Sequence, residues 1–186
     1  MNVILKSTWN SRWLPTENKK YLRTNCPSNL TKEEIAWLKD NNVLTVIDLR
    51  EEIECLKYPC PLEKEKGFKY LHMPVSGGDV YPETPEEVLE AYKHMVDKKT
   101  FHIVDTLIKC KTKVIYFCAS GKDRTGVVSA LLLKKLGYDE QTIINDYMIS
   151  KNNLLELLEY VKKEHPDKEI KSIIPDPIYI KTVLSL

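Results

Sequence analysis

The sequence lacks several features that would assign it to a familiar class. None of its apolar runs approaches the length of about 20 residues that a membrane-spanning helix needs. Residues 1–9 lack the basic start and the long apolar core of a secretory signal. The chain also contains no internal repeat and no low-complexity segment. We therefore expect a soluble, cytoplasmic protein without a membrane span, and we expect it to be a monomer.

The chain also has no excess of charge of either sign. Its 28 Lys and Arg residues face 27 Asp and Glu residues, the formal net charge is +1, and no long basic tract occurs. Nucleic-acid-binding domains usually carry a basic patch or stripe, so the composition does not favour a nucleic-acid partner. The nucleotide-binding loop Gly-x4-Gly-Lys-Ser/Thr is absent as well. A kinase or an ATPase is therefore disfavoured.

Metal-binding and disulfide patterns are missing too. The five cysteines are an odd number and lack the paired short spacings of a zinc site or a disulfide framework. Cys55 and Cys60 lie five residues apart, but prolines flank Cys60, which suits a loop. The histidines are scattered, with no His/Glu pair at ligand spacing. We expect reduced thiols, no metal and no cofactor.

The pattern of apolar runs and capping residues predicts a single α/β domain over residues 1–186. This length allows one core that buries about 70% of the unfolded surface. Apolar, β-branched runs predict strands, and capping residues before apolar stripes predict helices. Strands are expected at residues 3–9, 21–24, 43–49, 68–73 and 114–117. Helices are expected at residues 32–40, 85–97, 101–109, 127–136 and 139–149, after Asn153, and from Asp176 onward. This order predicts a central, mostly parallel sheet flanked by helices.

Residues 118–126, Cys-Ala-Ser-Gly-Lys-Asp-Arg-Thr-Gly, lie between the predicted strand 114–117 and a predicted helix. In α/β proteins, ligands bind outside the carboxyl ends of buried strands, where a helix start offers free N–H groups and a positive dipole end. Arg124 can donate two parallel hydrogen bonds to a phosphate. A cation and a helix start can also lower a thiol pKa from about 8.5 to roughly 3.5–7.5, which favours Cys118 as a nucleophile. The predicted phosphate-binding residues are Ala119, Ser120, Gly121, Lys122, Asp123 and Arg124.

This Cys-x5-Arg-Thr string resembles the signature loop of the protein tyrosine phosphatase superfamily. The fuller string Gly-Lys-Asp-Arg-Thr-Gly is similar to its bacterial dual-specificity-like branch. Three other segments also resemble that branch, so the resemblance covers most of the chain: residues 10–14 (Asn-Ser-Arg-Trp-Leu), 21–24 (Tyr-Leu-Arg-Thr) and 46–50 (Val-Ile-Asp-Leu-Arg). One departure is Phe117, because the family usually has His before the nucleophile.

The resemblance implies a metal-free, two-step hydrolysis of phosphate monoesters. Cys118 would attack phosphorus, Arg124 and the loop N–H groups would hold the phosphate oxygens, and water would cleave the cysteinyl-phosphate. Phosphotyrosine in proteins is the first expected substrate, and phosphoserine, phosphothreonine and phosphoinositides stay open. By resemblance, Thr125 hydrogen-bonds the leaving thiolate. Its spacing alone equally fits a Thr bonded to helix backbone.

The general acid that protonates the leaving oxygen is expected at Asp79. This residue follows Gly77-Gly78 after a predicted strand and resembles the acid on the mobile loop of dual-specificity phosphatases. Loop composition alone fits an ordinary turn Asp equally well. Asp123 inside the signature loop is the competitor, because an Asp there has been proposed for this role in some lipid phosphatases of the superfamily.

Other interpretations of the same residues stay open. Phe117 is compatible with a non-catalytic phosphate-binding module, a pseudophosphatase, and a sulfur-transfer enzyme is a weaker third reading. Lys122 either widens the positive potential and favours substrates with a second phosphate or is an ordinary solvated lysine. Arg50 either lines the pocket rim or forms a salt bridge with Glu54 or another local acid, and we favour the salt bridge.

Overall fold

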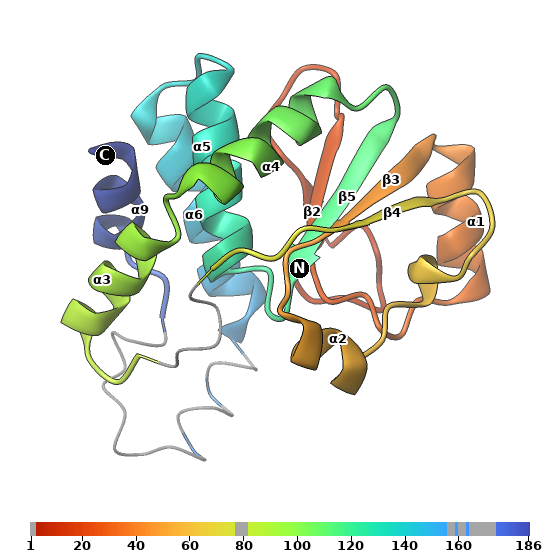
Figure 1. Ribbon diagram of the computed structural model, residues 1–186, viewed down its shortest axis with the longest axis horizontal. Coiled ribbons are helices and arrows are strands. Elements are labelled where there is room, and N and C mark those ends of the chain that lie inside the picture. Colours follow the sequence, from red (N-terminus) through yellow and green to blue (C-terminus); the bar gives the residue numbers. More distant parts are fainter. Residues whose placement is uncertain (1–2, 77–81, 156–158, 160–162, 164–173) are drawn as a thin grey trace.

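A five-stranded sheet in the order β1-β2-β5-β3-β4 carries the fold. The computed structural model describes residues 3–76, 82–155, 159, 163 and 174–186 (Figure 1). Strand β1 is antiparallel to β2, whereas β2, β5, β3 and β4 run parallel. The strands are β1 (Arg12–Trp13), β2 (Tyr21–Asn25), β3 (Val43–Asp48), β4 (Lys69–His72) and β5 (Lys113–Cys118). The predicted α/β fold with a central, mostly parallel sheet is confirmed.

Helices cover both faces of this sheet (Figure 1). Helix α1 (Lys32–Asp40) packs against β3 on one face. On the other face, α5 (Asp123–Lys135) lies against β5 and contacts α4 (Lys98–Lys109), α6 (Glu140–Asn153) and α9 (Pro177–Leu184). Helix α3 (Pro85–His94) packs on α9, and the short helices α2 (Glu52–Lys57) and η1 (Pro61–Glu63) connect β3 with β4. Strand β5 therefore lies in the middle of the molecule.

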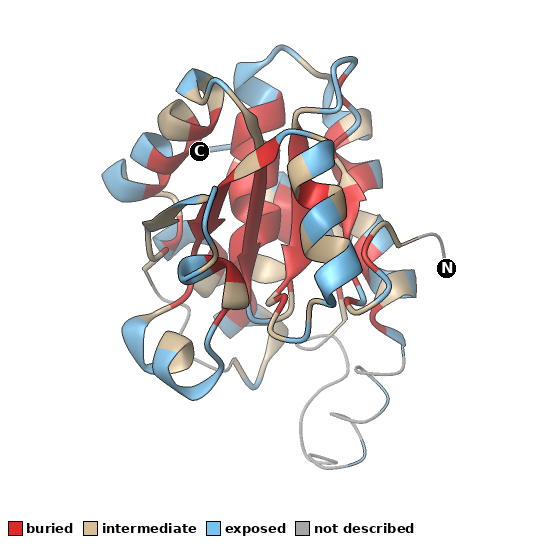
Figure 2. Ribbon diagram, turned by 90° about the vertical axis from the view of Figure 1, so that its right-hand side faces the viewer, coloured by how far each residue is buried: buried red, intermediate tan, exposed pale blue. Residues whose placement is uncertain are grey.

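The side chains of β5 divide between two apolar clusters. Tyr116 and Cys118 belong to the large cluster under α3, α4, α5, α6 and α9, whereas Ile115 and Phe117 belong to the smaller cluster under α1. This division follows from the period of two along a strand. Figure 2 shows the buried strands between helices whose outer faces are exposed. The prediction that this strand is buried on both faces is confirmed, and Cys118 faces the helical layer that contains α5.

The local signals at several element ends are confirmed. Thr31 and Glu34 form the predicted capping box of α1, with the Thr31 hydroxyl accepting from the Glu34 N–H at 3.2 Å and the Glu34 carboxylate accepting from the Thr31 N–H at 3.0 Å. Asp176 caps α9, which begins at Pro177 as predicted. Gly137, with a φ of +84°, follows the end of α5.

Other predicted bounds were wrong. Residues 3–9 form turns and no strand, because the N–H groups of Ile4 and Leu5 bond to Ser11 and close a local loop. The helix expected at 85–97 ends at His94, and Asp97 caps α4 instead, so that α4 begins before the predicted residue 101. Helix α5, by contrast, begins at Asp123, next to Arg124 where the helix was expected to start, and the apolar run from residue 127 is its continuation. Asn153 is the last residue of α6, and most of the helix expected after it lies outside the described residues.

Two negative findings concern the described residues. No helix among them is both long enough and apolar enough to span a bilayer. No group of three or more His, Cys, Asp or Glu side chains among them could hold a metal ion. All five cysteines are free thiols, as expected.

Candidate active site

Cys118 is the last residue of β5, and α5 begins at Asp123 after a short loop. In the sheet register Cys118 lies beside Asn25 of β2, and Phe117 lies beside Asp48 of β3. The thiol therefore sits at the carboxyl edge of the sheet, between two parallel neighbours. Arg124, in the first turn of α5, is 5% exposed. The predicted order of strand, loop and helix is confirmed, and it brings the thiol and the guanidinium to one loop.

Gly121 fixes the path of this loop. Its φ of +68° lies in the left-handed region that side chains disfavour. A Cβ at this position would lie 2.4 Å from the Thr24 carbonyl oxygen and 2.6 Å from the Asn25 nitrogen. Both of these atoms belong to the backbone of β2, so neither can move aside easily. The loop thus rests directly on the end of β2, and only glycine permits that approach.

The Gly121 carbonyl is held from inside the protein by two side chains that precede it in the chain. Asn10 Nδ2 donates to this oxygen at 2.9 Å, and an Arg23 terminal nitrogen donates at 2.8 Å. Both residues belong to segments that resemble the phosphatase branch. These donors therefore hold the Gly121 carbonyl toward the protein interior. The two segments thereby shape the loop.

Asp146 of α6 neutralises the cations behind the loop. Its carboxylate accepts from Arg23 at 2.5 Å and from Arg12 Nε at 3.0 Å, and all three side chains are buried. Burial alone would raise the pKa of Asp146, but the positive charges of Arg23 and Arg12 hold that pKa below its usual value. Burial and the charge of Arg23 lower the pKa of Arg12 to about 10. Sequence reasoning missed Asp146, although two buried arginines demand a carboxylate partner.

Arg124 forms an ion pair with Glu54 of α2. The two terminal nitrogens of Arg124 donate to the two carboxylate oxygens of Glu54 at 2.5 and 2.7 Å. Burial opposes the charged form of Arg124, but the hydrogen bond with Glu54 and the Cys118 sulfur raise its pKa. Burial likewise opposes the charged form of Glu54, yet its bond with Arg124 lowers the pKa of this carboxyl. Arg124 therefore stays charged and fixed in direction.

The way Glu54 binds leaves one edge of the guanidinium open. A guanidinium carries five N–H donors in a planar fork. Glu54 takes one donor from each terminal nitrogen, and Nε makes no hydrogen bond with any described residue. The Nε–H and the second N–H of a terminal nitrogen together form another two-pronged edge. That edge matches two oxygens of a phosphate.

Arg50 is buried beside Asp48 and does not line the rim of the pocket. Its guanidinium pairs with Asp48 at 2.6 Å and is buried. The predicted salt bridge with a local acid is confirmed, but the acid is Asp48, and Glu54 serves Arg124 instead. Arg50 also stacks over the ring of Phe117, 5.3 Å from its centroid. Phe117 thus packs on the sheet face opposite to Cys118, as strand alternation requires.

The remaining predicted residues of the loop have distinct surroundings. Asp123 accepts from the Tyr92 hydroxyl of α3 at 2.7 Å, and Lys122 Nζ lies 3.4 Å from the same carboxylate. Tyr92 also bonds the hydroxyl of Tyr147 at 2.7 Å. Thr125 is buried, and its Oγ1 has no hydrogen-bond partner in the described part of the chain. Ala119 and Ser120 lie in the turn that connects β5 to α5. Asp79, the predicted general acid, lies outside the described residues.

Comparisons with known proteins identify a family for this chain. A model described as the tyrosine phosphatase family matches residues 8–185. The triple specificity protein phosphatase PtpB of Mycobacterium tuberculosis is 38% identical over 60 residues, which is 32% of this chain and 22% of that protein. A tyrosine-protein phosphatase of Nostoc commune is 28% identical over 144 residues, 72% of this chain and 49% of that protein. This chain thus spans about half or less of the length of these relatives.

Among solved structures, a kinase associated phosphatase with its catalytic-site cysteine replaced by serine has a TM-score of 0.51 to this chain. The two are 16% identical, and the match covers 88% of this chain and 83% of the other. At this identity the likeness concerns the fold alone.

Proposed function

This chain belongs to the tyrosine phosphatase family, and on that premise we propose that it is a cysteine-dependent phosphatase that hydrolyses phosphate monoesters. We take residues 1–186 as one catalytic domain. The observation that carries the proposal is the pairing of Cys118 with Arg124 across one loop at the carboxyl edge of the sheet. Arg124 is fixed by Glu54 and keeps a two-pronged edge for a phosphate.

The reaction we propose has two steps. The sulfur of Cys118 attacks phosphorus, an S–P bond forms, and the P–O bond to the leaving group breaks as the general acid protonates that oxygen. Water then attacks phosphorus while the deprotonated acid takes its proton, an O–P bond forms, and the S–P bond breaks to give inorganic phosphate and the free thiolate. Arg124 and the loop N–H groups hold the three equatorial oxygens in both steps. The hydroxyl of Thr125, which has no hydrogen-bond partner among the described residues, supports its proposed role as a donor to the departing thiolate.

The first test is the substitution Cys118→Ser, assayed with p-nitrophenyl phosphate. We expect turnover to vanish while vanadate binding persists, because Arg124 and the loop remain and only the nucleophile is lost. Arg124→Lys supplies the complementary loss, roughly 10²-fold or more, since an ammonium lacks the two-pronged fork. Turnover of Cys118→Ser near the wild-type rate would refute the covalent mechanism.

One observation keeps a second candidate, a phosphate-binding module without turnover. Phe117 stands where the family usually has His, and its ring packs against Arg50. If the wild-type protein binds vanadate but does not hydrolyse p-nitrophenyl phosphate, the binding module is correct. Release of thiocyanate from thiosulfate and cyanide would instead indicate sulfur transfer.

For the general acid we propose Asp79, with Asp123 as the competitor. Asp123 already accepts a hydrogen bond from the Tyr92 hydroxyl and lies beside Lys122, so its carboxylate is held by neighbours within the protein. Asp79→Asn should slow hydrolysis of phosphotyrosine far more than hydrolysis of p-nitrophenyl phosphate, whose leaving group needs less protonation. If Asp123→Asn shows that dependence and Asp79→Asn does not, the acid belongs to the signature loop.

The substrate class we propose is phosphotyrosine in proteins. The name of the M. tuberculosis relative, a triple specificity phosphatase, supports a test of phosphoserine, phosphothreonine and phosphoinositides beside it. We also propose that Lys122 favours substrates with a second phosphate. Ranking kcat/KM over a panel of phosphopeptides and lipids tests the class, and Lys122→Ala should lower activity on polyphosphorylated substrates selectively.

A further inference from the structure

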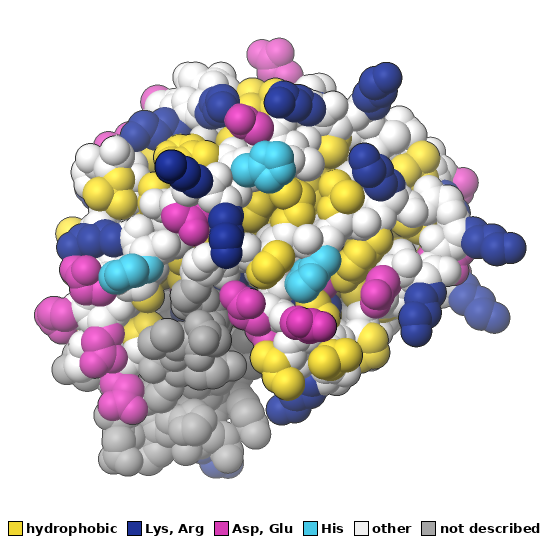
Figure 3. Space-filling model, in the orientation of Figure 1, with side chains coloured by type: hydrophobic (Ala, Val, Ile, Leu, Met, Phe, Trp, Pro, Cys, Tyr) yellow, Lys and Arg dark blue, Asp and Glu magenta, His cyan; other side chains and the backbone are white. Residues whose placement is uncertain are grey.

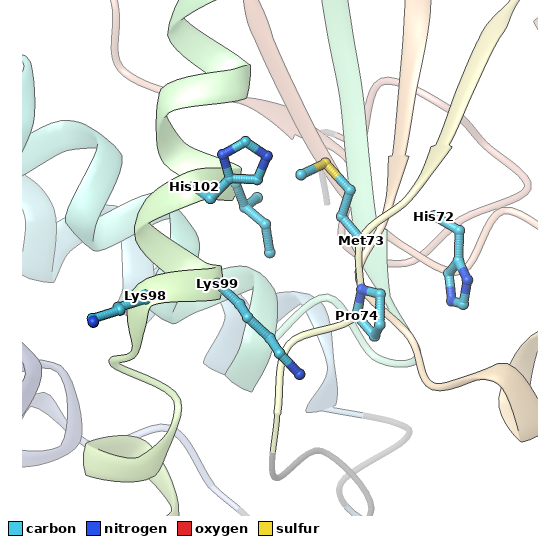
Figure 4. A pocket seen from close by; sticks show the side chains of 7 residues that line it. His72, Met73, Pro74, Lys98, Lys99 and His102 are labelled. Carbon is cyan, nitrogen blue, oxygen red and sulfur yellow. The ribbon is translucent and has the colours of Figure 1, made fainter.

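A pocket separate from the signature loop opens between the end of β4 and the first turns of α4. Its volume is about 460 Å³, and its walls are residues 72–74 together with Lys98, Lys99, His102 and Ile103. In Figure 4 the side chains of Met73 and His102 point toward each other across the opening, and Lys99 extends along its lower side toward Pro74. Pockets of about 300–1,000 Å³ are large enough to hold small ligands.

The floor of this pocket is apolar, and its open side carries the positive charge of Lys99 and the imidazole of His102. Met73, Pro74 and the buried Ile103 supply the apolar surface, while Lys99 and His102 are exposed. The space-filling view shows hydrophobic side chains between lysine and histidine side chains on this face (Figure 3). The nearby carboxylate of Asp97 is already bonded to the Thr100 N–H and the Ser76 hydroxyl. The chemistry suits an apolar side chain next to a carboxylate.

Two wall residues do not contribute to this charge. Figure 4 shows the side chains of Lys98 and His72 pointing away from the pocket. The His72 Nε2 instead lies 2.7 Å from the Arg50 carbonyl oxygen. The side chains of Lys98 and Lys99 therefore point in different directions, although the two residues are adjacent in the sequence. The pair offers a matched comparison for any test of the pocket.

The sheet register sets the distance from this pocket to Cys118. His72 lies beside Asp48, and Asp48 lies beside Phe117, so these residues form one row across three parallel strands. Neighbouring strands are about 4.8 Å apart, which places the pocket about 10 Å from the strand that ends at Cys118. An extended peptide advances about 3.3 Å per residue. A peptide along this edge therefore covers the distance in about three residues.

We propose that this pocket is a docking site for phosphorylated protein substrates, which recognises an apolar residue next to an acidic residue about three positions from the phosphorylated one. The proposal rests on the proposed phosphatase function. A membrane surface fits less well, because lipid binding calls for apolar side chains that protrude, whereas Met73 and Ile103 lie in a hollow.

The experiment compares Lys99→Glu with Lys98→Glu on phosphotyrosine peptides that carry an Asp-Leu pair at each position from four before to four after the phosphotyrosine. We expect one position near three to raise kcat/KM of the wild type, and Lys99→Glu to lower that value about 2- to 5-fold, as loss of an exposed charge contact implies. Replacing the peptide Asp by Lys should restore activity to Lys99→Glu. Lys98→Glu should behave as the wild type.

Two readouts separate this proposal from the proposed function. Both variants should hydrolyse p-nitrophenyl phosphate at the wild-type rate, because that substrate is too small to reach the pocket. Peptide affinity measured with Cys118→Ser, by fluorescence anisotropy, should show the same order even if turnover is absent. Three results would each overturn the docking site. The first is an equal loss of kcat/KM in the two variants, and the second is the absence of a preferred peptide position. The third is binding to anionic vesicles that depends on Lys99 and is tighter than binding to the peptides. No hydrolysis of p-nitrophenyl phosphate by the wild type would refute the phosphatase function alone.

Discussion

The substitution Glu54→Gln tests whether Arg124 depends on its carboxylate partner. Glutamine keeps the size of the side chain, but its amide presents one acceptor and one donor where the carboxylate presents two acceptors. One of the two bonds, at 2.5 and 2.7 Å, is therefore lost, and the remaining one loses its ionic partner. Gln can still accept the Glu51 N–H that caps α2. The change thus concerns the direction of Arg124 and spares the helix.

The expected size of the effect follows from the burial of this pair. The Arg124 side chain is 6% exposed and that of Glu54 is 20% exposed, so water screens the pair only partly. A hydrogen bond between sheltered, charged groups contributes about 1.5–3 kcal/mol. Each 1.4 kcal/mol lost from transition-state binding is about tenfold in rate. We therefore expect kcat/KM to fall about 10- to 10²-fold, mainly through kcat, because the phosphate charge that Arg124 meets is greatest in the transition state.

Steady-state kinetics with p-nitrophenyl phosphate measure this effect, and Glu52→Gln supplies the control. Glu52 lies on the same short helix, is exposed, and undergoes the same change of charge. If the two variants agree within about twofold, Glu54 does not position Arg124. A rise in kcat/KM for Glu54→Gln would also refute the reasoning, since it would mean that the carboxylate competes with the substrate phosphate.

Two further substitutions test the support of the loop. Gly121→Ala should abolish turnover and lower the melting temperature, because its Cβ would lie 2.4 Å from the Thr24 backbone. Gly137→Ala is the control: it also lies at positive φ but has no atom within 4 Å, so it should cost only about 1–2 kcal/mol of stability and keep activity. Asp146→Asn should cost about 3 kcal/mol in calorimetry, because it leaves two buried arginines without their anion. The pKa of Asp146 is lower in the folded state than in the unfolded state, so its stabilisation is present above pH of about 4 and is lost as pH falls further. The wild type should therefore lose melting temperature more steeply than Asp146→Asn in that acid range, and parallel curves would contradict the assignment.

The parts of the fold that local signals determine were predictable. The capping box at Thr31 and the apolar run of β5 each contain their own evidence, and both are confirmed. The strand predicted at residues 3–9 was wrong because an apolar run does not indicate which partners its backbone hydrogen bonds have. Here Leu5 is buried, as in a strand, but its N–H bonds to the Ser11 hydroxyl in a local loop. The wrong helix end at residue 97 had another cause. Asp97 is an N-cap residue that marks the start of α4, but the apolar stripe before it led to the prediction that the preceding helix continues to residue 97.

The candidate site divides in the same way. Cys118 and Arg124 lie within one contiguous string, so their meeting follows from the chain itself. Glu54 of α2 and Tyr92 of α3 bond to residues of the signature string, and Asp146 of α6 pairs with Arg23 behind it. Nothing local to those helices indicates these contacts. Chemistry predicts that a buried guanidinium has a carboxylate partner but not which carboxylate. That choice is made by how helices pack, which no single segment encodes.

Phe117 and Glu54 both bear on the positive potential around Cys118. The ring of Phe117 packs with Arg50 on the sheet face away from the helical layer. A side chain at this position therefore does not face Cys118 directly. With no imidazole there, the proposed thiolate has Arg124 and the loop N–H groups as its source of positive potential. The charge of Arg124 is always present, but its effect on the sulfur depends on where the guanidinium points, and Glu54 fixes that direction. In this chain the carboxylate on α2 should therefore matter for the nucleophile as well as for phosphate binding. The rate of Cys118 alkylation by iodoacetamide should accordingly fall in Glu54→Gln, whereas a role in phosphate binding alone would leave the alkylation rate unchanged.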